Sequence, residues 1–278
     1  MESIYKKHAR IALIKDDPVE FPHRYERPED IEVVSLIASS FSYGQVAQFK
    51  KAIEKILAVL GESPHAALMK MDAVVFLKKL DGVYYRFNRP EDIAGYLLLI
   101  SEALKKHGTL GKLFMSLPGD TSAERLSAFV AALLSADTAP VYGKNRKPGG
   151  LRQLLPDPKS GTACKRMHMF LRWMVRRDEI DFGLWSEFGA ERLLIPLDTH
   201  VARFSKRVGL TGRNATDHKT ALDVTGAFLI LNPSDPIKYD FALAHRGISG
   251  ECGAEADPKN CLNCEFNKVC KDAGSSRR

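Results

Sequence analysis

The sequence lacks the long apolar runs of a membrane protein. No segment of its 278 residues reaches the roughly 18 consecutive apolar residues that a membrane-spanning helix needs. The first ten residues are charged and no apolar stretch follows them, so we expect no secretory signal. The sequence therefore predicts a cytoplasmic protein, nucleoid-associated if its partner is DNA. Its 45% of hydrophobic residues suffices for a proper core.

Acidic residues are in the minority. The chain has 41 Lys and Arg residues against 34 Asp and Glu residues, which gives a net charge of +7. This balance favours an anionic partner such as nucleic acid, although many basic proteins bind no polyanion.

Alternating strand patterns are scarce, and residues 83–87 are the best candidate for one. A segment rich in Gly, Pro and basic residues, 139–159, is typical of an exposed loop. Elsewhere apolar residues recur at helical spacing, so the sequence predicts an all-α fold. The helical segments expected from this spacing are 31–41, 49–60, 94–104, 126–134, 167–175, 201–208 and 222–229.

Cysteine is rare, but four of the five cysteines lie close together near the C-terminus. They are Cys252, Cys261, Cys264 and Cys270. In a cytoplasmic protein such thiols are more often metal ligands than disulfide partners. Four thiolates on one loop suit an iron–sulfur cluster or a structural zinc ion, and the spacing alone leaves both open.

The segment 241–247 together with these cysteines resembles the C-terminus of endonuclease III-type DNA glycosylases, of the helix-hairpin-helix superfamily. The last two gaps between cysteines match the family, whereas the first gap is longer here. A second segment, 195–204, is similar to the family's stretch with an aspartate at a helix N-terminus. The resemblance implies a [4Fe–4S] cluster on the four cysteines in preference to zinc, and a catalytic role for Asp198.

The chemistry explains why an aspartate belongs in such a site. Breaking an N-glycosidic bond builds positive charge on the sugar, which a fixed carboxylate stabilises while it can also accept a proton. The alternative is that Asp198 or Thr199 only caps the helix that follows.

Bifunctional members of the superfamily use a lysine that follows a glycine-containing hairpin. Here Gly161 and Lys165 precede an apolar helix in that order, which implies that Lys165 is the nucleophile. The hairpin keeps a single glycine, and the long Lys165-to-Asp198 gap is more similar to that of archaeal 8-oxoguanine DNA glycosylases. The alternative is that Lys165 and Arg166 are phosphate-facing surface residues.

Further DNA contacts are expected around these residues. Base flipping leaves a gap that a side chain must fill, and the resemblance implies Gln45 for this role. The expected contacts with DNA are Gln45, Tyr43, Gly161, Arg166, Arg203 and Lys206. Trp173 is predicted to lie in the core, and Trp185 could line the base pocket.

The resemblance implies two helical subdomains with a DNA-binding cleft between them. Residues 28–197 would form a six-helix barrel with the hairpin, and residues 1–27 and 198–278 an iron–sulfur cluster domain. It also implies a monomeric base-excision-repair DNA glycosylase with AP lyase activity on double-stranded DNA that contains damaged bases. A non-catalytic damage-sensing iron–sulfur protein, a redox protein and a monofunctional glycosylase with activated water remain alternatives. The lesion stays open.

Overall fold

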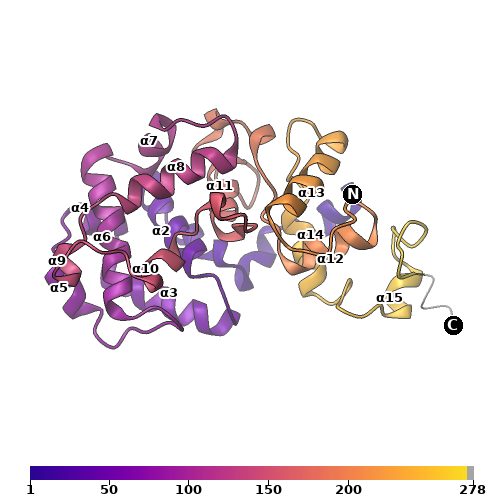
Figure 1. The fold of residues 1–278 in the computed structure, drawn as a ribbon. Helices are drawn as coiled ribbons and strands as arrows, with labels where there is room; N and C mark the ends of the chain where they lie inside the picture. The colour runs from indigo at the N-terminus through magenta and orange to yellow at the C-terminus, as the bar shows by residue number, and fades with distance from the viewer. Residues whose placement is uncertain (274–278) are drawn as a thin grey trace.

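The computed structural model describes residues 1–273 and consists of helices joined by short connections (Figure 1). In this part of the chain the extended segments form only isolated bridges and no β-strand. The α-helices are α1 Glu2–His8, α2 Pro28–Phe41, α3 Val46–Leu60, α4 Pro64–Met69, α5 Ala73–Lys79, α6 Pro90–His107, α7 Leu110–Ser116, α8 Ser122–Leu134, α9 Ala139–Tyr142, α10 Gly149–Leu154, α11 Lys165–Val175, α12 Thr199–Arg207, α13 His218–Leu231, α14 Asp240–Ile248 and α15 Pro258–Leu262. The 3-10 helices are η1 Ile11–Asp16, η2 Pro18–Glu20, η3 Pro22–Arg24, η4 Pro158–Ser160, η5 Ser186–Phe188 and η6 Ala190–Arg192.

The all-α prediction is confirmed, and each segment with helical spacing lies in a helix, except that Val208 at the end of 201–208 is the C-cap of α12. Two local predictions are wrong. Residues 83–87 form a turn closed by a bridge between Tyr85 and Asn88, because no neighbouring strand is present to pair with them. The expected loop 139–159 contains α9, α10 and η4, two of which have a proline in their first turn, where proline is compatible with a helix.

The helix starts carry local signals that explain their positions. Thr121 and Glu124 form a reciprocal capping box at the start of α8. Side chains of Asp72, Asp198 and Asp217 accept backbone N–H donors at the starts of α5, α12 and α13. Such caps satisfy amides that have no partner inside the helix.

Helix α2 is the centre of the larger part of the molecule. Every residue from Asp30 to Phe41 is buried, and the helix contacts α3, α4, α7 and α11. Helix α6 packs against α4, α5, α7 and α8 on the other side of this core. The buried surface of α2 is mostly apolar, but it also includes the polar side chains of Asp30, Glu32, Ser35, Ser39 and Ser40.

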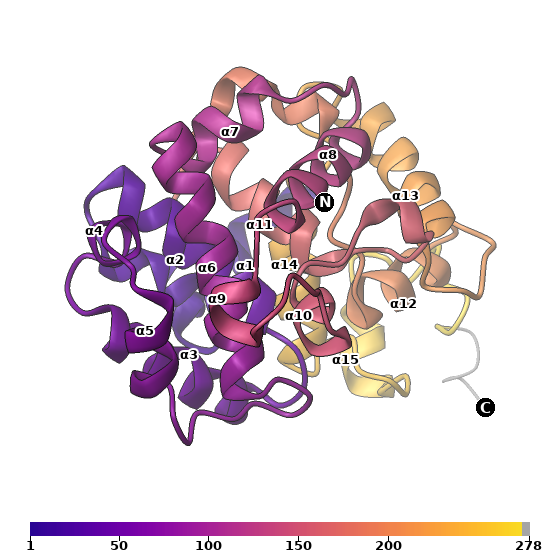
Figure 2. The same cartoon turned by 60° about the vertical axis from the view of Figure 1, so that its left-hand side comes forward.

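Helices from the two ends of the chain lie together. Helix α1 packs against α14, which also packs against α12, so the first helix of the chain lies with the last ones. Figures 1 and 2 both place α12, α13 and α15 far from α4 and α5. None of the helices in residues 1–273 is long and apolar enough to cross a membrane.

Candidate functional site

The predicted nucleophile lies at the start of α11, directly after a tight corner. Gly161 and Cys164 have left-handed backbones, with φ of +79° and +43°. Gly161 ends η4, and its carbonyl accepts the amide of His218 at the start of α13. The buried Cys164 precedes Lys165, the first residue of α11. The corner therefore fixes the direction in which Lys165 leaves the backbone.

Asp198 precedes α12 and faces Lys165. Its Oδ1 accepts the amide of Val201 at 2.8 Å, as the capping alternative expects. Its Oδ2 lies 3.3 Å from Nζ of Lys165. The two interpretations of Asp198 are thus compatible, because one oxygen caps the helix and the other meets the amine.

Lys165 and Asp198 line one cavity of about 450 Å³. The side chain of Lys165 is 41% exposed and that of Asp198 is 12% exposed, so the pair is accessible from outside. The other lining residues are Asp17, Pro18, Ser42, Tyr43, Gly44, Val46, Phe49, Met169, Leu197, Thr199, His200, Thr216 and Ile248. A cavity that combines apolar walls with an amine and carboxylates is typical of a small-molecule or nucleobase site.

Helices α12 and α14 make a close contact beside this cavity. A Cβ atom on Gly247 would lie 2.4 Å from Nδ1 of His200, so only glycine allows α14 to approach α12 so closely. Nδ1 of His200 lies 3.0 Å from a guanidinium nitrogen of Arg203. Burial lowers the pKa of His200, and the nearby Arg203 adds to this effect, which favours the neutral ring.

The predicted DNA-contacting residues on the hairpin side divide into two groups. Tyr43 lines the cavity and donates its hydroxyl to Asn88, whereas Gln45 is exposed directly before α3 and is not a lining residue. Arg166 donates to the backbone carbonyls of Ser40 and Gln153. Its guanidinium thereby joins α11 to α2 and α10, and the contact of Arg166 with DNA stays a prediction.

Gly161, Arg203 and Lys206 have partly engaged donors. The amide of Gly161 donates within its own turn to the carbonyl of Pro158, and its contact with DNA stays a prediction. Arg203 and Lys206 line a second groove of about 410 Å³, which contains Thr199 and Thr216 of the first cavity as well. This groove therefore adjoins the Lys165–Asp198 cavity, and it is rich in cationic side chains.

All four predicted cysteine ligands line a single small cavity. Arg207 Nη1 donates to Sγ of Cys252 at 3.4 Å, and Arg246 Nη2 donates to Sγ of Cys264 at 3.2 Å. Arg207 also donates to carbonyls of this loop and pairs with Asp272, so α12 anchors the loop directly.

The donor set fits an iron–sulfur cluster by its chemistry. Thiolates are the ligands of such clusters, and N–H donors to sulfur are common around them. In residues 1–273, no three His, Cys, Asp or Glu side chains come close enough to hold a single metal ion. The thiols thus surround a shared space instead of converging on one point.

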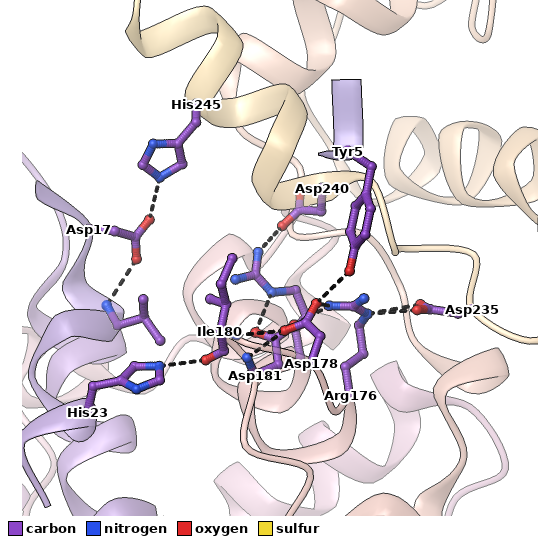
Figure 3. A network of polar contacts seen from close by, with 12 residues as sticks. Tyr5, Asp17, His23, Arg176, Asp178, Ile180, Asp181, Asp235, Asp240 and His245 are labelled. Carbon is purple, nitrogen blue, oxygen red and sulfur yellow. Dashed lines mark hydrogen bonds and ion pairs between the residues drawn. The ribbon is translucent and has the colours of Figure 1, made fainter. Parts of the chain in front are cut away.

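The other end of α11 carries a sealed ionic network (Figure 3). Arg172 binds Asp181 and Asp240, and Arg176 binds Asp178, Asp181 and Asp235. The two guanidiniums are about 5% exposed or less. The network joins the end of α11 to the start of α14 and to the segment before it, and Tyr5 of α1 donates to Asp178.

Sequence reasoning misplaced Trp185 and missed most of the cavity wall. Trp185 is 2% exposed, stacks on Phe114 and donates to Glu32, so it belongs to the core. Trp173 is fully buried, as predicted. Asp17 and Phe49 line the cavity without any motif around them that points to a site.

The chain belongs to the DUF2400 family, whose model matches residues 17–249 and which is described as a protein family of unknown function. The match includes Lys165 and Asp198, whereas the four clustered cysteines follow it in the sequence. No curated protein and no solved structure matches the chain.

Proposed function

We propose that this protein is a DNA N-glycosylase with AP lyase activity, in which Lys165 is the nucleophile. The observation that carries the proposal is the 3.3 Å approach of Lys165 Nζ to Asp198 Oδ2 in an accessible cavity. The two residues lie far apart in the sequence, and separate helix starts bring them together. An amine beside a carboxylate is an arrangement that covalent catalysis at a sugar requires.

The proposed reaction starts with a damaged nucleotide flipped into the cavity. The neutral amine of Lys165 attacks C1′, and the bond between C1′ and the base breaks, with the electron pair leaving on the base. The sugar ring then opens, O4′ takes a proton, and the amine nitrogen forms a protonated imine with C1′. Loss of a proton from C2′ then expels the 3′ phosphate and cuts the strand.

Asp198 has two tasks in this proposal. Its carboxylate accepts a proton from Lys165 before attack and passes it to the departing base, and the carboxylate restored in this way stabilises the positive charge that grows on the sugar ring. Because Oδ1 is fixed by the amide of Val201, the orientation of the free oxygen is set before substrate binds.

The resident cofactor in this proposal is a [4Fe–4S] cluster held by Cys252, Cys261, Cys264 and Cys270. Four cysteine thiols that line one cavity are a donor set suited to such a cluster. Such a cluster would stabilise the loop anchored by Arg207, and no bond of the substrate is broken there.

The proposed partner is double-stranded DNA, bound by a monomer in a cleft between the two parts of the molecule. The groove lined by Arg203, Lys206 and Arg213 adjoins the catalytic cavity and would follow the phosphate backbone. Binding through such contacts weakens steeply with salt, because counterion release contributes most of the affinity. A protein with this partner would be associated with the nucleoid.

The experiment that tests this function is borohydride trapping on duplexes with 8-oxoguanine, thymine glycol, uracil or an abasic site. Borohydride reduces the imine to a stable amine, so wild type should give a covalent complex that Lys165→Ala lacks. The exposed Lys159→Ala is the matched control and should trap as wild type does. Base release without trapping would favour activated water as nucleophile, and neither activity on any duplex would contradict the proposal.

A separate assay tests the cofactor. Anaerobically purified protein should contain iron and sulfide, and replacing Cys261 or Cys264 by serine should lower the iron content strongly. Cys164→Ser is the matched control, since this cysteine lies far from the cluster loop in the sequence. A protein that contains zinc in place of iron would contradict the cluster.

A further inference from the structure

Asp17 is a second carboxylate in the wall of the catalytic cavity. It comes from the N-terminal segment, directly before η2, and lines the cavity together with Lys165 and Asp198. Its side chain is 17% exposed, so most of it is enclosed by protein. No step of the proposed reaction uses this group, and its place in the cavity therefore needs another explanation.

The protein holds the Asp17 side chain firmly in one orientation. Oδ1 accepts the amide of Val19 at 2.9 Å, and Oδ2 lies 3.4 Å from Nε2 of His245 (Figure 3). Burial by itself would raise the pKa of Asp17, but the hydrogen bonds from His245 and Val19 outweigh it and lower the pKa. The group is therefore an ionised carboxylate near neutral pH.

An ionised carboxylate can only accept hydrogen bonds. Each oxygen of Asp17 has one protein donor, and a carboxylate oxygen can accept more than one, so Asp17 keeps capacity for a ligand. A ligand atom that faces it must carry a hydrogen, because an acceptor placed against a buried carboxylate is left unpaired and repelled. Asp17 therefore favours a ligand that presents a hydrogen-bond donor to it over one that presents an acceptor.

The rest of the wall suits a flat ring. Pro18, Val46, Phe49 and Met169 present apolar atoms to the same cavity. Flipped bases are held by such surfaces and recognised through the hydrogen bonds of their edges. In this cavity the apolar side chains would pack against any base, whereas Asp17 would distinguish one base from another.

We propose that Asp17 is a specificity-determining residue that selects bases with a ring N–H beside a carbonyl group, the lactam edge. This inference rests on the proposed glycosylase function and names its substrate class. Hypoxanthine, oxidised guanines, uracil and oxidised thymines carry such an edge. Adenine and cytosine present a bare ring nitrogen at the corresponding position, which would face the carboxylate as a second acceptor.

The test is single-turnover base release from two matched pairs of duplexes. One pair contains hypoxanthine or 1-methylhypoxanthine, and the other contains 5-hydroxyuracil or 5-hydroxycytosine. A site that hydrogen-bonds an N–H group discriminates strongly against analogues without it, so wild type should favour the lactam member by about 100-fold or more. In Asp17→Asn, whose amide can both donate and accept, the preference should fall below about 10-fold.

Two controls separate specificity from folding. Asp81→Asn changes an exposed carboxylate outside the cavity and should keep the full preference. Thermal unfolding of Asp17→Asn shows whether the near-isosteric change preserves the fold. A purely structural role for Asp17 would slow both members of each pair equally, and this result would overturn the inference.

Other outcomes are also decisive. Release of both members at equal rates by wild type, or a preference that survives in Asp17→Asn, would overturn the inference and leave the glycosylase function intact. Trapping at abasic sites without release of any lactam base would also overturn the inference. Absence of both trapping and base release would reject the proposed function together with the inference.

Discussion

The two ends of α11 carry ion pairs of opposite character. At the first residue, Lys165 meets Asp198 in a cavity, and the lysine side chain is 41% exposed. At the other end, Arg172 is enclosed with Asp181 and Asp240, and all three side chains are at most 5% exposed. The same helix thus combines an accessible pair, available to a substrate, with a sealed one.

The difference in burial decides what each pair can do. Burial alone would lower the pKa of Arg172, but Asp181 and Asp240 raise it, so its charge is permanent. Removing one member of a sealed pair leaves a charge with no partner, which is costly. A half-exposed pair contributes little to stability but is free to exchange protons and partners. We therefore assign stability to the sealed end and chemistry to the open end.

The largest expected effect is on catalysis at the open end. Asp198→Asn should lower base release by at least about a hundredfold, because the charge that stabilises the sugar cation is lost. Stability should change by less than about 1 kcal/mol, since asparagine is also a good helix cap. Single-turnover kinetics and chemical unfolding measure the two effects.

Asp217→Asn is the matched control, because Asp217 caps α13 in the same way but lies outside the cavity. It should leave base release unchanged. Full base-release activity of Asp198→Asn would contradict the assignment of catalysis to the Lys165–Asp198 end of α11.

At the sealed end, Arg172→Ala should lower the free energy of unfolding by about 3–5 kcal/mol. The reason is that Asp181 and Asp240 stay buried without this partner. Arg177→Ala, a nearby exposed arginine, should change stability by less than about 0.5 kcal/mol. Urea unfolding gives both values, and equal effects of the two variants would contradict the distinction.

His168 lies between the two ends and predicts a pH effect. It is fully buried, and burial lowers its pKa from 6.5 to about 3. Between these values the unfolded chain binds more protons, so stability is complete above pH 6.5 and is lost as the pH falls. From pH 6.5 to 5 the loss should approach about 2 kcal/mol.

The comparison of wild type with His168→Leu measures this contribution. The free energy of unfolding of the variant should depend less steeply on pH in this range, because leucine cannot take up a proton. Identical pH dependence of the two proteins would contradict the assignment to His168.

The sequence predicted the helices well because the buried face of a helix requires apolar residues at regular spacing. The stripe in 167–175 defined α11, and the cap at Asp198 defined the start of α12. It also singled out Lys165, Asp198 and the four cysteines, since residue type and spacing carry their chemistry. These residues lie together in two cavities.

Contacts between distant segments left no such record. Arg166 and Lys165 are neighbours in the sequence, but consecutive side chains of a helix point in different directions. Arg166 therefore reaches the carbonyl of Ser40, whereas Lys165 lines the cavity. Asp17 reaches the cavity only because η2 packs against α2. Trp185, between Lys165 and Asp198 in the sequence, is an aromatic residue of the core and not of the cavity wall.

The most direct test of the central claim is to identify the amino acid that borohydride links to DNA. Wild type would be trapped on a duplex with an abasic site, digested with protease and nuclease, and mapped by mass spectrometry. The account predicts a single modified peptide with the sugar remnant on Nζ of Lys165. A remnant on another amine, such as Lys159 or the N-terminus, would contradict the account.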